Sequence, residues 1–242
     1  MISKERIKQL RALQKKKSRD LKQEFIIEGA KMIEEAIKYA PDNLLQIFGT
    51  EPISIALPKH TAFTQIDDRA LAQVSALKQP QEQVAVCSYL TPRQAPSDFY
   101  LALDTIQDPG NLGTILRLAA WFGVEKVIAS RETVDCYNPK VVQASMGAIF
   151  NVEVEYLDLQ EALAATDLPI YGALIEGENI YQKNISRKGI LVMGNEGSGI
   201  SKSLLPLITD PVTIPQFGKG ESLNVAMATA ILLSEFSRPR PL

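Results

Sequence analysis

The chain has 242 residues, 45% of them hydrophobic, and a formal net charge of −2, so it can form one large domain or two small ones with a substantial core. It contains no apolar run long enough to span a bilayer and its first residues are charged, which argues against a membrane protein and favours the cytoplasm. The two cysteines lack metal-site spacing and His60 is the only histidine, which argues against a His-based catalytic triad and a zinc site, so no metal is expected.

The chain begins with a basic segment. Residues 1–31 hold ten Lys/Arg and four Asp/Glu, a net charge of +6, whereas the remainder holds 16 and 24, a net charge of −8. Ile7, Leu10 and Leu13 predict a helix over residues 3–14, and the densest positive run, Lys15 to Arg19, follows it. A basic arm on an acidic body suggests contact with a polyanion, although a solvated helix face would carry the same charges.

A small α/β domain is predicted for residues 1–92. Its expected elements are strands at 24–28, 44–48 and 84–90, a helix at 29–39, and a helix that ends at Leu77 and is capped by Asp67 or Asp68. The stretch 53–57 is ambiguous because prolines stand on both sides of it. Residues 91–98 contain two prolines and no hydrophobic period, and they are the best candidate for a linker.

Strands and helices alternate in the second predicted domain, residues 98–242. The expected strands are 100–106, 126–129, 152–156, 170–174, 189–193 and 212–214; the expected helices are 112–122, 139–146, 159–165, a short one near 201–207, and 222–236. Such alternation implies a parallel sheet with helices on its faces. Ligands of these sheets bind where the strands end at their carboxyl side.

The final helix organises this half of the chain. Residues 222–236 are apolar on almost every side, which predicts burial in a core or against a second subunit. The first turn nevertheless carries Ser222 and Asn224, directly after the glycine-containing stretch 218–221. Small polar groups at the start of an apolar helix suggest the floor of a binding site.

Two further loops follow predicted strands. In the loop 107–117, Asn111 is placed to cap the next helix, and Arg117 lies off that helix's apolar stripe. The loop 193–201 contains Gly194, Asn195, Glu196 and Gly199, and its glycines let the backbone approach a ligand closely. It is neither the G-x-G-x-x-G dinucleotide fingerprint nor a G-K-[ST] phosphate loop.

Together, in this order, the three loops resemble the three motifs of the SpoU (TrmH) family of RNA 2′-O-methyltransferases in the SPOUT superfamily. The resemblance is carried by Asn111 with Arg117, by Gly194-x-Glu196-Gly197-x-Gly199, and by Ile214-Pro215 with Ser222-Leu223-Asn224-Val225. Residues 141–148 are similar to the segment between the first two motifs, and the first 90 residues, with 25–29, are similar to the family's substrate-binding domain. One departure is 118–121, where members often carry small or polar residues, and it leaves the local dimer or substrate surface open.

The resemblance implies a fold, a cofactor and a site. The catalytic domain of such enzymes is an α/β fold with a deep trefoil knot, forms homodimers and binds S-adenosylmethionine in the knot, with the active site near the subunit interface. The implied catalytic residues are Asn111, Arg117, Glu196, Ser222 and Asn224. The implied cofactor-binding residues are Leu174, Gly194, Asn195, Gly199, Ile214 and Leu223, and the loop 175–179 is expected to close over the methionine part.

The resemblance also implies an RNA substrate reached through the basic arm and Arg117. Ribosomal RNA of the large subunit (23S) is the first choice and transfer RNA the second. Arg117 is expected to anchor a phosphate and stabilise the developing alkoxide, since a free arginine is almost always protonated, while Glu196 could orient Arg117 or a substrate hydroxyl. Helix capping by Asn111 and Ser222 and plain surface charge for Glu196 are the alternatives. A non-catalytic RNA-binding protein and a nucleotide-dependent oxidoreductase are the rival functions, and the oxidoreductase is weakened by the missing fingerprint.

Overall fold

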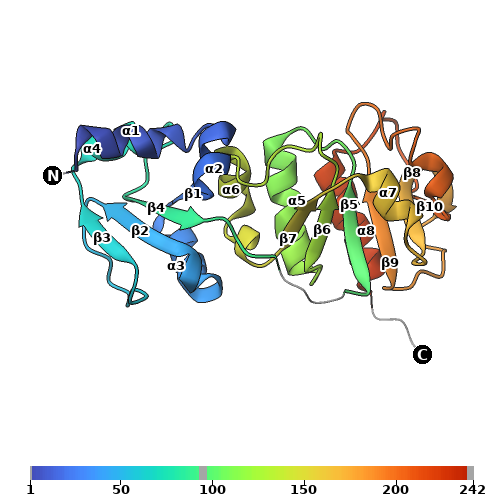
Figure 1. Cartoon of the computed structure of the whole chain (residues 1–242). Coiled ribbons are helices and arrows are strands. Elements are labelled where there is room, and N and C mark those ends of the chain that lie inside the picture. Colours follow the sequence, from blue (N-terminus) through green and yellow to red (C-terminus); the bar gives the residue numbers. More distant parts are fainter. Residues whose placement is uncertain (1, 93–96, 239–242) are drawn as a thin grey trace. The chain divides into compact units, whose positions relative to one another are not determined.

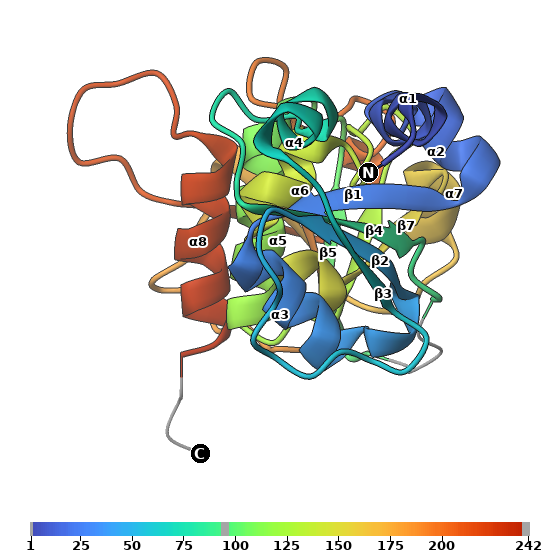
Figure 2. The same ribbon diagram turned by 90° about the vertical axis from the view of Figure 1, so that its left-hand side faces the viewer.

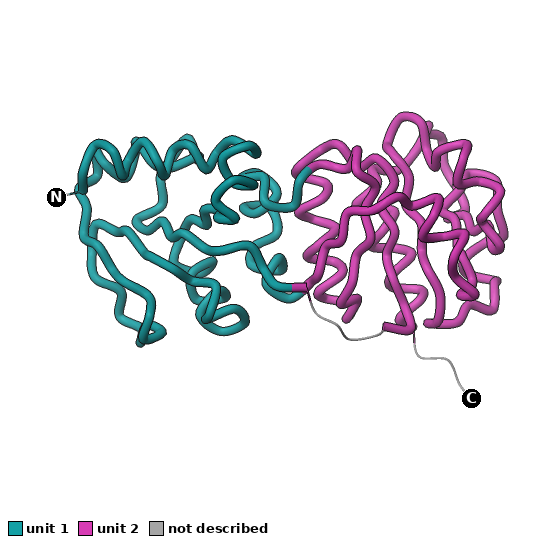
Figure 3. Tube along the Cα trace, in the orientation of Figure 1, with its two compact units in different colours: residues 1–91, 135–151 teal, residues 92–134, 152–242 magenta. Residues whose placement is uncertain are grey.

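The computed structural model describes residues 2–92 and 97–238, and these form two compact units (Figure 3). The first unit comprises residues 1–91 and 135–151, and the second comprises 92–134 and 152–242. Part of the predicted linker, residues 93–96, lies outside the described residues. The stretch 135–151 falls within the range 98–242 that the sequence analysis gave to the second domain, yet it is grouped with the first unit.

The first unit is built on a four-stranded sheet in the order β1-β4-β2-β3 (Figure 1). Its strands are β1 (Glu24–Glu28), β2 (Leu44–Gly49), β3 (Ala62–Gln65) and β4 (Gln83–Ser88). β4 is antiparallel to β1 and β2, whereas β3 is parallel to β2. Three of these strands were expected from the sequence, and β3 was not. The ambiguous stretch 53–57 forms no strand or helix.

Helices cover both faces of this sheet (Figure 2). Alternate residues of β1 point to opposite sides: Ile26 joins the core under α1 (Lys4–Ala12) and α4 (Asp68–Val74), whereas Phe25 and Ile27 join the core under α3 (Ala30–Tyr39). A short 3₁₀ helix, Pro41–Asn43, leads from α3 into β2. Of the two capping candidates for α4, Asp67 is the N-cap, and the helix ends at Val74 rather than at Leu77.

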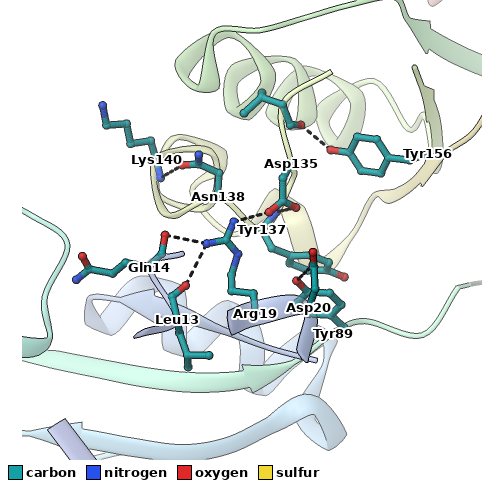
Figure 4. A network of polar contacts seen from close by, with 11 residues as sticks. Leu13, Gln14, Arg19, Asp20, Tyr89, Asp135, Tyr137, Asn138, Lys140 and Tyr156 are labelled. Carbon is teal, nitrogen blue, oxygen red and sulfur yellow. Dashed lines mark hydrogen bonds and ion pairs between the residues drawn. The ribbon is translucent and has the colours of Figure 1, made fainter. Parts of the chain in front are cut away.

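The basic arm is part of this fold. Leu10 and Leu13 are fully or almost fully buried, and the positive run that was predicted only as charge forms a second helix, α2 (Lys16–Lys22). The side chain of Arg19 in α2 is only 2% exposed and forms an ion pair with Asp135 (Figure 4). Its Nη1 also donates hydrogen bonds to the carbonyl oxygens of Leu13 and Gln14, each at 3.0 Å. Arg19 therefore stabilises the arm and is withdrawn from any contact with a polyanion.

Residues 135–151 complete the first unit. Helix α6 (Pro139–Ser145) is capped by Asn138, and the 3₁₀ helix Ala148–Phe150 follows it. Val142, Ile149 and Phe150 are buried in the same core as β1. The ring of Tyr137 stacks on that of Tyr89 with 4.0 Å between centroids. Burial raises the pKa of the Tyr137 hydroxyl, which keeps it neutral where it accepts a hydrogen bond from the N–H of Leu90 at 3.0 Å.

The second unit contains a six-stranded sheet in which all neighbours are parallel, in the order β10-β8-β9-β5-β6-β7. The strands are β5 (Phe99–Leu103), β6 (Lys126–Ala129), β7 (Glu153–Tyr156), β8 (Ile170–Asn179), β9 (Gly189–Met193) and β10 (Asp210–Thr213). The predicted α/β fold with a parallel sheet is confirmed. Because every strand runs the same way, the carboxyl ends of β5, β6 and β9 meet at one edge.

Helices α5 (Pro109–Trp121) and α8 (Val225–Phe236) pack against each other, and the ring of Phe236 contacts Phe99 and Tyr171 of the sheet. Helix α7 (Leu159–Ala164) and the 3₁₀ helix Leu205–Leu207 belong with a separate core cluster that includes Ile200 and Leu204. Of the residues that the structure describes, none forms a helix long and apolar enough to cross a membrane.

Two predicted boundaries at the site are wrong. The stretch 175–179, expected as a loop, is assigned to β8, but only its last two residues pair with β10, at Val212↔Glu178 and Thr213↔Asn179. The register shifts between Gly172 and Glu178, so residues 173–177 lie in an irregularity of the strand. The final helix begins at Val225 rather than at Ser222, because the side chain of Asn224 caps it. Pairing with a distant strand decides the first boundary, and a local cap decides the second.

Candidate functional site

The three loops singled out in the sequence meet at Asn111. Its amide Nδ2 donates to Oε1 of Glu196 at 2.6 Å, and its Oδ1 accepts from Nδ2 of Asn224 at 3.0 Å. Glu196 comes from the loop after β9, and Asn224 stands at the start of α8. A single side chain thus joins segments that are 85 and 113 residues away along the chain.

The predicted capping role of Asn111 is wrong, and the reason explains its bridging role. Asp108 caps α5 instead, since its Oδ1 accepts from the backbone N–H of Asn111 at 2.8 Å, and Pro109 occupies the first helical position. Asn111 therefore lies in the first turn with its side-chain amide directed away from its own helix. Both polar atoms of that amide bind the other two loops.

Asn224 caps α8 and contributes to the same network. Its Oδ1 accepts from the N–H of Ala226 at 2.9 Å while its Nδ2 reaches Asn111. Ser222, the alternative cap, is exposed and its hydroxyl has no hydrogen-bond partner among the described residues. The cap fixes the direction of the Asn224 amide, and the hydroxyl of Ser222 is left accessible.

Arg117 lies two turns along α5 from Asn111, on an exposed part of the helix. In the described part of the chain its guanidinium has no hydrogen bond or ion pair, and Glu196 contacts Asn111 rather than Arg117. The expectation that Glu196 orients Arg117 is not met within this chain. The guanidinium, with its five donors, is available to an anionic ligand.

Two residues of the site were missed in the sequence. Asp104, directly after β5, is only 3% exposed, and its Oδ2 accepts from the N–H of Ser201 at 2.6 Å. Thr105 adopts a φ of 58°, which is rare for a β-branched residue. Its N–H donates to Oγ of Ser130 at 3.0 Å, and its carbonyl accepts from Nδ2 of Asn195 at 2.9 Å. The signal in the sequence was the carboxylate directly after an apolar run; the strand predicted over 100–106 in fact ends at Leu103, so Asp104 and Thr105 lie outside it.

These contacts bind the strand-end loops together. Asp104 and Thr105 hold both ends of the loop after β9, through Ser201 and Asn195 respectively. A backbone held in a sparsely populated region at a strand end persists because several bonds determine it. The loop that carries Glu196 is therefore positioned before any ligand arrives.

The loop after β9 is a tight hairpin. Asn195 and Gly199 exchange two backbone hydrogen bonds, at 3.0 and 2.9 Å, and Gly199 has a φ of 70°. A Cβ placed on Gly194 would lie 2.3 Å from the backbone of Gly199 and of Ile200, so only glycine fits there. Oδ1 of Asn195 accepts from the N–H groups of Gly197 and Ser198. Asn195 thus shapes the loop with both its side chain and its backbone.

The remaining predicted cofactor residues lie near this hairpin. β8 and β9 pair from Ile170↔Ile190 to Gly172↔Val192, so Leu174 and Gly194 each stand two residues beyond the last pair. Ile214 follows Thr213, whose hydroxyl donates to the carbonyl of Ile175 at 2.9 Å, so it lies next to the same part of β8. Leu174 and Ile214 are half-buried and Leu223 is 53% exposed. Accessible apolar side chains beside a glycine-containing hairpin suit the flat, apolar faces of an adenine ring.

In the described parts of the chain, no group of three or more His, Cys, Asp or Glu side chains is placed to hold a metal ion. His60, far from the site in the sequence, contacts the carbonyl of Pro41 at 3.1 Å and belongs to the first unit. The polar groups that the site offers are the guanidinium of Arg117, the carboxylate of Glu196, the amides of Asn111 and Asn224, and the hydroxyl of Ser222. Such groups can orient and stabilise charge without a metal.

Comparison with known proteins gives matches over both units. The family described as SpoU rRNA Methylase matches residues 98–234, and the MRM3-like substrate binding domain matches residues 4–85. A 23S rRNA (guanosine(2553)-2′-O)-methyltransferase, RlmP, from Bacillus subtilis (strain 168) is 32% identical over 95% of this chain and 94% of its own.

Solved structures are similar over the same length. A TrmH-family protein from Porphyromonas gingivalis has a TM-score of 0.89 and 37% identity, covering 98% of both chains. An AdoMet-bound rRNA methyltransferase from Sinorhizobium meliloti has a TM-score of 0.83 and 25% identity, covering 97% of this chain and 95% of that one. The likeness thus extends over both units and includes the loops that meet at Asn111.

Proposed function

This chain belongs to the SpoU rRNA methylase family, and from that membership and the geometry of its site we propose that it transfers a methyl group from S-adenosylmethionine to a ribose 2′-hydroxyl of 23S ribosomal RNA. The observation that carries the proposal is the bridge at Asn111, which joins the three family motifs through hydrogen bonds to Glu196 and Asn224. The substrate-binding domain matched at residues 4–85 and the likeness to RlmP support ribosomal RNA as the substrate. Transfer RNA is the second choice.

We place the cofactor at the hairpin after β9. Leu174, Ile214 and Leu223 offer accessible apolar surface, and the glycines at 194 and 199 let a ligand approach the hairpin, whose shape is held by the backbone hydrogen bonds between Asn195 and Gly199. When bound, S-adenosylmethionine supplies an electrophilic methyl group. The protein holds the acceptor oxygen in line with that group, because proximity and orientation carry much of such a barrier.

Arg117 is proposed as the residue that acts on the substrate. A guanidinium is almost always protonated, so its natural role is to bind an RNA phosphate and stabilise negative charge developing on the 2′-oxygen. Glu196 holds the amide of Asn111 in one orientation, and Ser222 and Asn224 are placed to hydrogen-bond ribose or backbone. The 2′-hydroxyl itself distinguishes RNA from DNA.

Three further parts of the proposal concern the topology of the chain, its division into domains and its location in the cell. The likeness of the fold to TrmH-family structures supports a C-terminal segment threaded into a trefoil knot. We also retain the division into an RNA-binding domain, residues 1–92, and a methyltransferase domain, residues 98–242, and we expect the enzyme to act in the cytoplasm.

A homodimer is proposed through the packed helices α5 and α8. Trp121 is 83% exposed and Met227 is 61% exposed, and large apolar side chains on two adjoining helices are typical of an interface. Thr114, Arg117 and Trp121 stand three and four residues apart, so they share one face of α5. The partner subunit would therefore lie close to Arg117.

Replacing Trp121 with lysine should convert the dimer into a monomer, because a charge at the centre of an apolar contact is left without a partner. Sedimentation velocity measures the change in mass. Tyr39→Lys is the matched control, since Tyr39 is an exposed aromatic residue of α3, 41% exposed, in the other unit. A Trp121→Lys protein that still sediments as a dimer contradicts this interface.

The proposed function is tested first by calorimetry. We expect binding of S-adenosylmethionine and no useful affinity for NAD, whereas an oxidoreductase would show the reverse. The RNA is then identified by mapping the 2′-O-methyl positions that are lost when the gene is deleted. A protein that binds S-adenosylmethionine but whose deletion leaves every ribosomal position methylated argues against 23S RNA, and loss in transfer RNA selects the second choice.

A further inference from the structure

A cleft of the first unit lies beside the basic arm, outside the site described above. Its volume is about 1100 Å³, and α1 forms one wall while the beginning of α4 and the end of β3 form the other. The charged residues that line it are Lys4, Lys8, Arg11, Asp67, Asp68 and Arg69. All of them belong to one compact unit, so the cleft does not depend on how the two units are arranged.

Four cations line this cleft. Lys4, Lys8 and Arg11 lie on α1 within an arc of about 60° and over a length of about 10 Å, because a helix turns once in 3.6 residues and rises 1.5 Å per residue. Arg69 faces them from α4. All four side chains are exposed. The arrangement is a row of positive charge along a concave surface, with one more charge opposite.

These cations are not used inside the protein. Within the described residues none of the four forms an ion pair, although Asp67 and Asp68 line the same cleft. Asp67 is occupied as the cap of α4, where its Oδ1 accepts from the N–H of Ala70 at 2.7 Å. By contrast, Arg19 of the same arm is buried and paired with Asp135. The arm therefore contains one buried and paired cation, Arg19, and a row of accessible cations on α1.

Two other lysines of this chain, unlike the four cations of the cleft, form ion pairs with carboxylates. Lys126 bonds to Glu155 and Glu153, and Lys183 bonds to Glu178 and Asp210. These partners raise the pKa of each ammonium group. Lys126 and Lys183 are thus satisfied by carboxylates of this chain. The unpaired row on α1 is consistent with a ligand that supplies the negative charge.

We propose that this cleft binds the sugar–phosphate backbone of the RNA substrate, with Lys4, Lys8 and Arg11 contacting successive phosphates and Arg69 closing on the strand from the opposite wall. The inference rests on the proposed function and assigns the part of the chain that holds the RNA. No aromatic side chain lines the cleft, so it offers no platform for stacked bases. Asp67 and Asp68 repel phosphate and keep the strand on the α1 side. The cleft thus holds RNA by charge and shape rather than by base sequence.

The test compares two double variants that remove the same charge. Lys8→Ala/Arg11→Ala removes two cations from the cleft, and Lys16→Ala/Lys17→Ala removes two exposed cations of α2 that do not line it. The probe is unmodified 23S ribosomal RNA, transcribed in vitro, and binding is measured by filter retention between 50 and 200 mM salt as chosen conditions. The cleft variant should bind roughly tenfold more weakly, and the slope of log affinity against log salt should fall by about 2, close to one unit for each lost phosphate contact.

Equal losses in the two double variants would overturn the proposal, because the arm would then act as diffuse charge. Unchanged binding by the cleft variant overturns it as well. Circular dichroism checks the helix content, and if the α1 variant unfolds, Arg69→Gln on the other wall decides by the same binding assay. Calorimetry with S-adenosylmethionine should be unaltered in every variant. Failure of the wild-type protein to bind S-adenosylmethionine would count against the proposed function, whereas the RNA-binding comparison addresses only the cleft.

Discussion

Replacing Arg117 with alanine should leave the binding of S-adenosylmethionine unchanged and lower the rate of methyl transfer by about 10²–10³-fold, the usual cost of removing one donor that stabilises transition-state charge. The side chain is exposed on α5 and has no partner among the described residues, so its loss leaves the hydrogen-bonded network around Asn111 intact. Calorimetry measures cofactor binding, and single-turnover transfer to the identified RNA measures the chemical step.

Two further variants separate charge from geometry. Arg117→Lys keeps the positive charge but loses the planar fork, so partial recovery indicates phosphate binding by charge and no recovery indicates dependence on the fork. Lys188→Ala is the control, because this exposed cation precedes β9 and so lies at the opposite edge of the sheet from the site. Full turnover by Arg117→Ala would show that Arg117 has no role in the reaction.

Replacing Arg19 with methionine should lower the free energy of unfolding of the first unit by about 3–5 kcal/mol, the range expected when one partner of a buried ion pair is removed. Asp135, whose side chain is 12% exposed, would keep its charge and lose its cation. The carbonyl oxygens of Leu13 and Gln14 would lose the donor that now binds them. Urea denaturation, followed by circular dichroism, measures the difference.

A double-mutant cycle gives the matched comparison. Arg19→Met with Asp135→Asn should be less destabilised than the sum of the two single variants, because no unpaired charge remains buried. Lys16→Met, at an exposed position of the same helix, should change stability by no more than about 0.5 kcal/mol. If Arg19→Met behaves like Lys16→Met, the ion pair with Asp135 contributes nothing to the fold.

The two arginines show why residue type alone does not assign a role. Both carry the same charge in the sequence, and Arg19 stands in the densest positive run of the chain. Arg19 is buried because the chain returns at Asp135 to complete the first unit, which no local pattern near residue 19 reveals. Arg117 stays accessible because the apolar stripe of α5 lies on another side of the helix. Contacts with distant segments decide between structural and functional charge.

The sequence predicted which loops form the site, but it did not predict which hydrogen bonds join them. Glycines and polar residues after apolar strands indicated where ligands bind, and parallel strands bring such loops to one edge. The choice of cap was not predictable, since Asp108 and Asn111 are both good caps and Pro109 between them favours the earlier start. The role of Thr105 could not be predicted, because β-branched residues do not prefer a positive φ. Its conformation is held by hydrogen bonds with Ser130 and Asn195.

The sequence by itself determined the elements whose signals are local: the alternation of strands and helices, the buried final helix, and the three loops that identify the family. Periodicity and glycine placement act over a few residues, so they can be followed along the chain without a structure. Only the tertiary structure decided that α6 completes the first unit, that β8 continues through Asn179, and that Asn111 joins the three loops. Each of these depends on a partner tens of residues away, because hydrogen bonds and packing join groups by distance in space rather than by order in the chain.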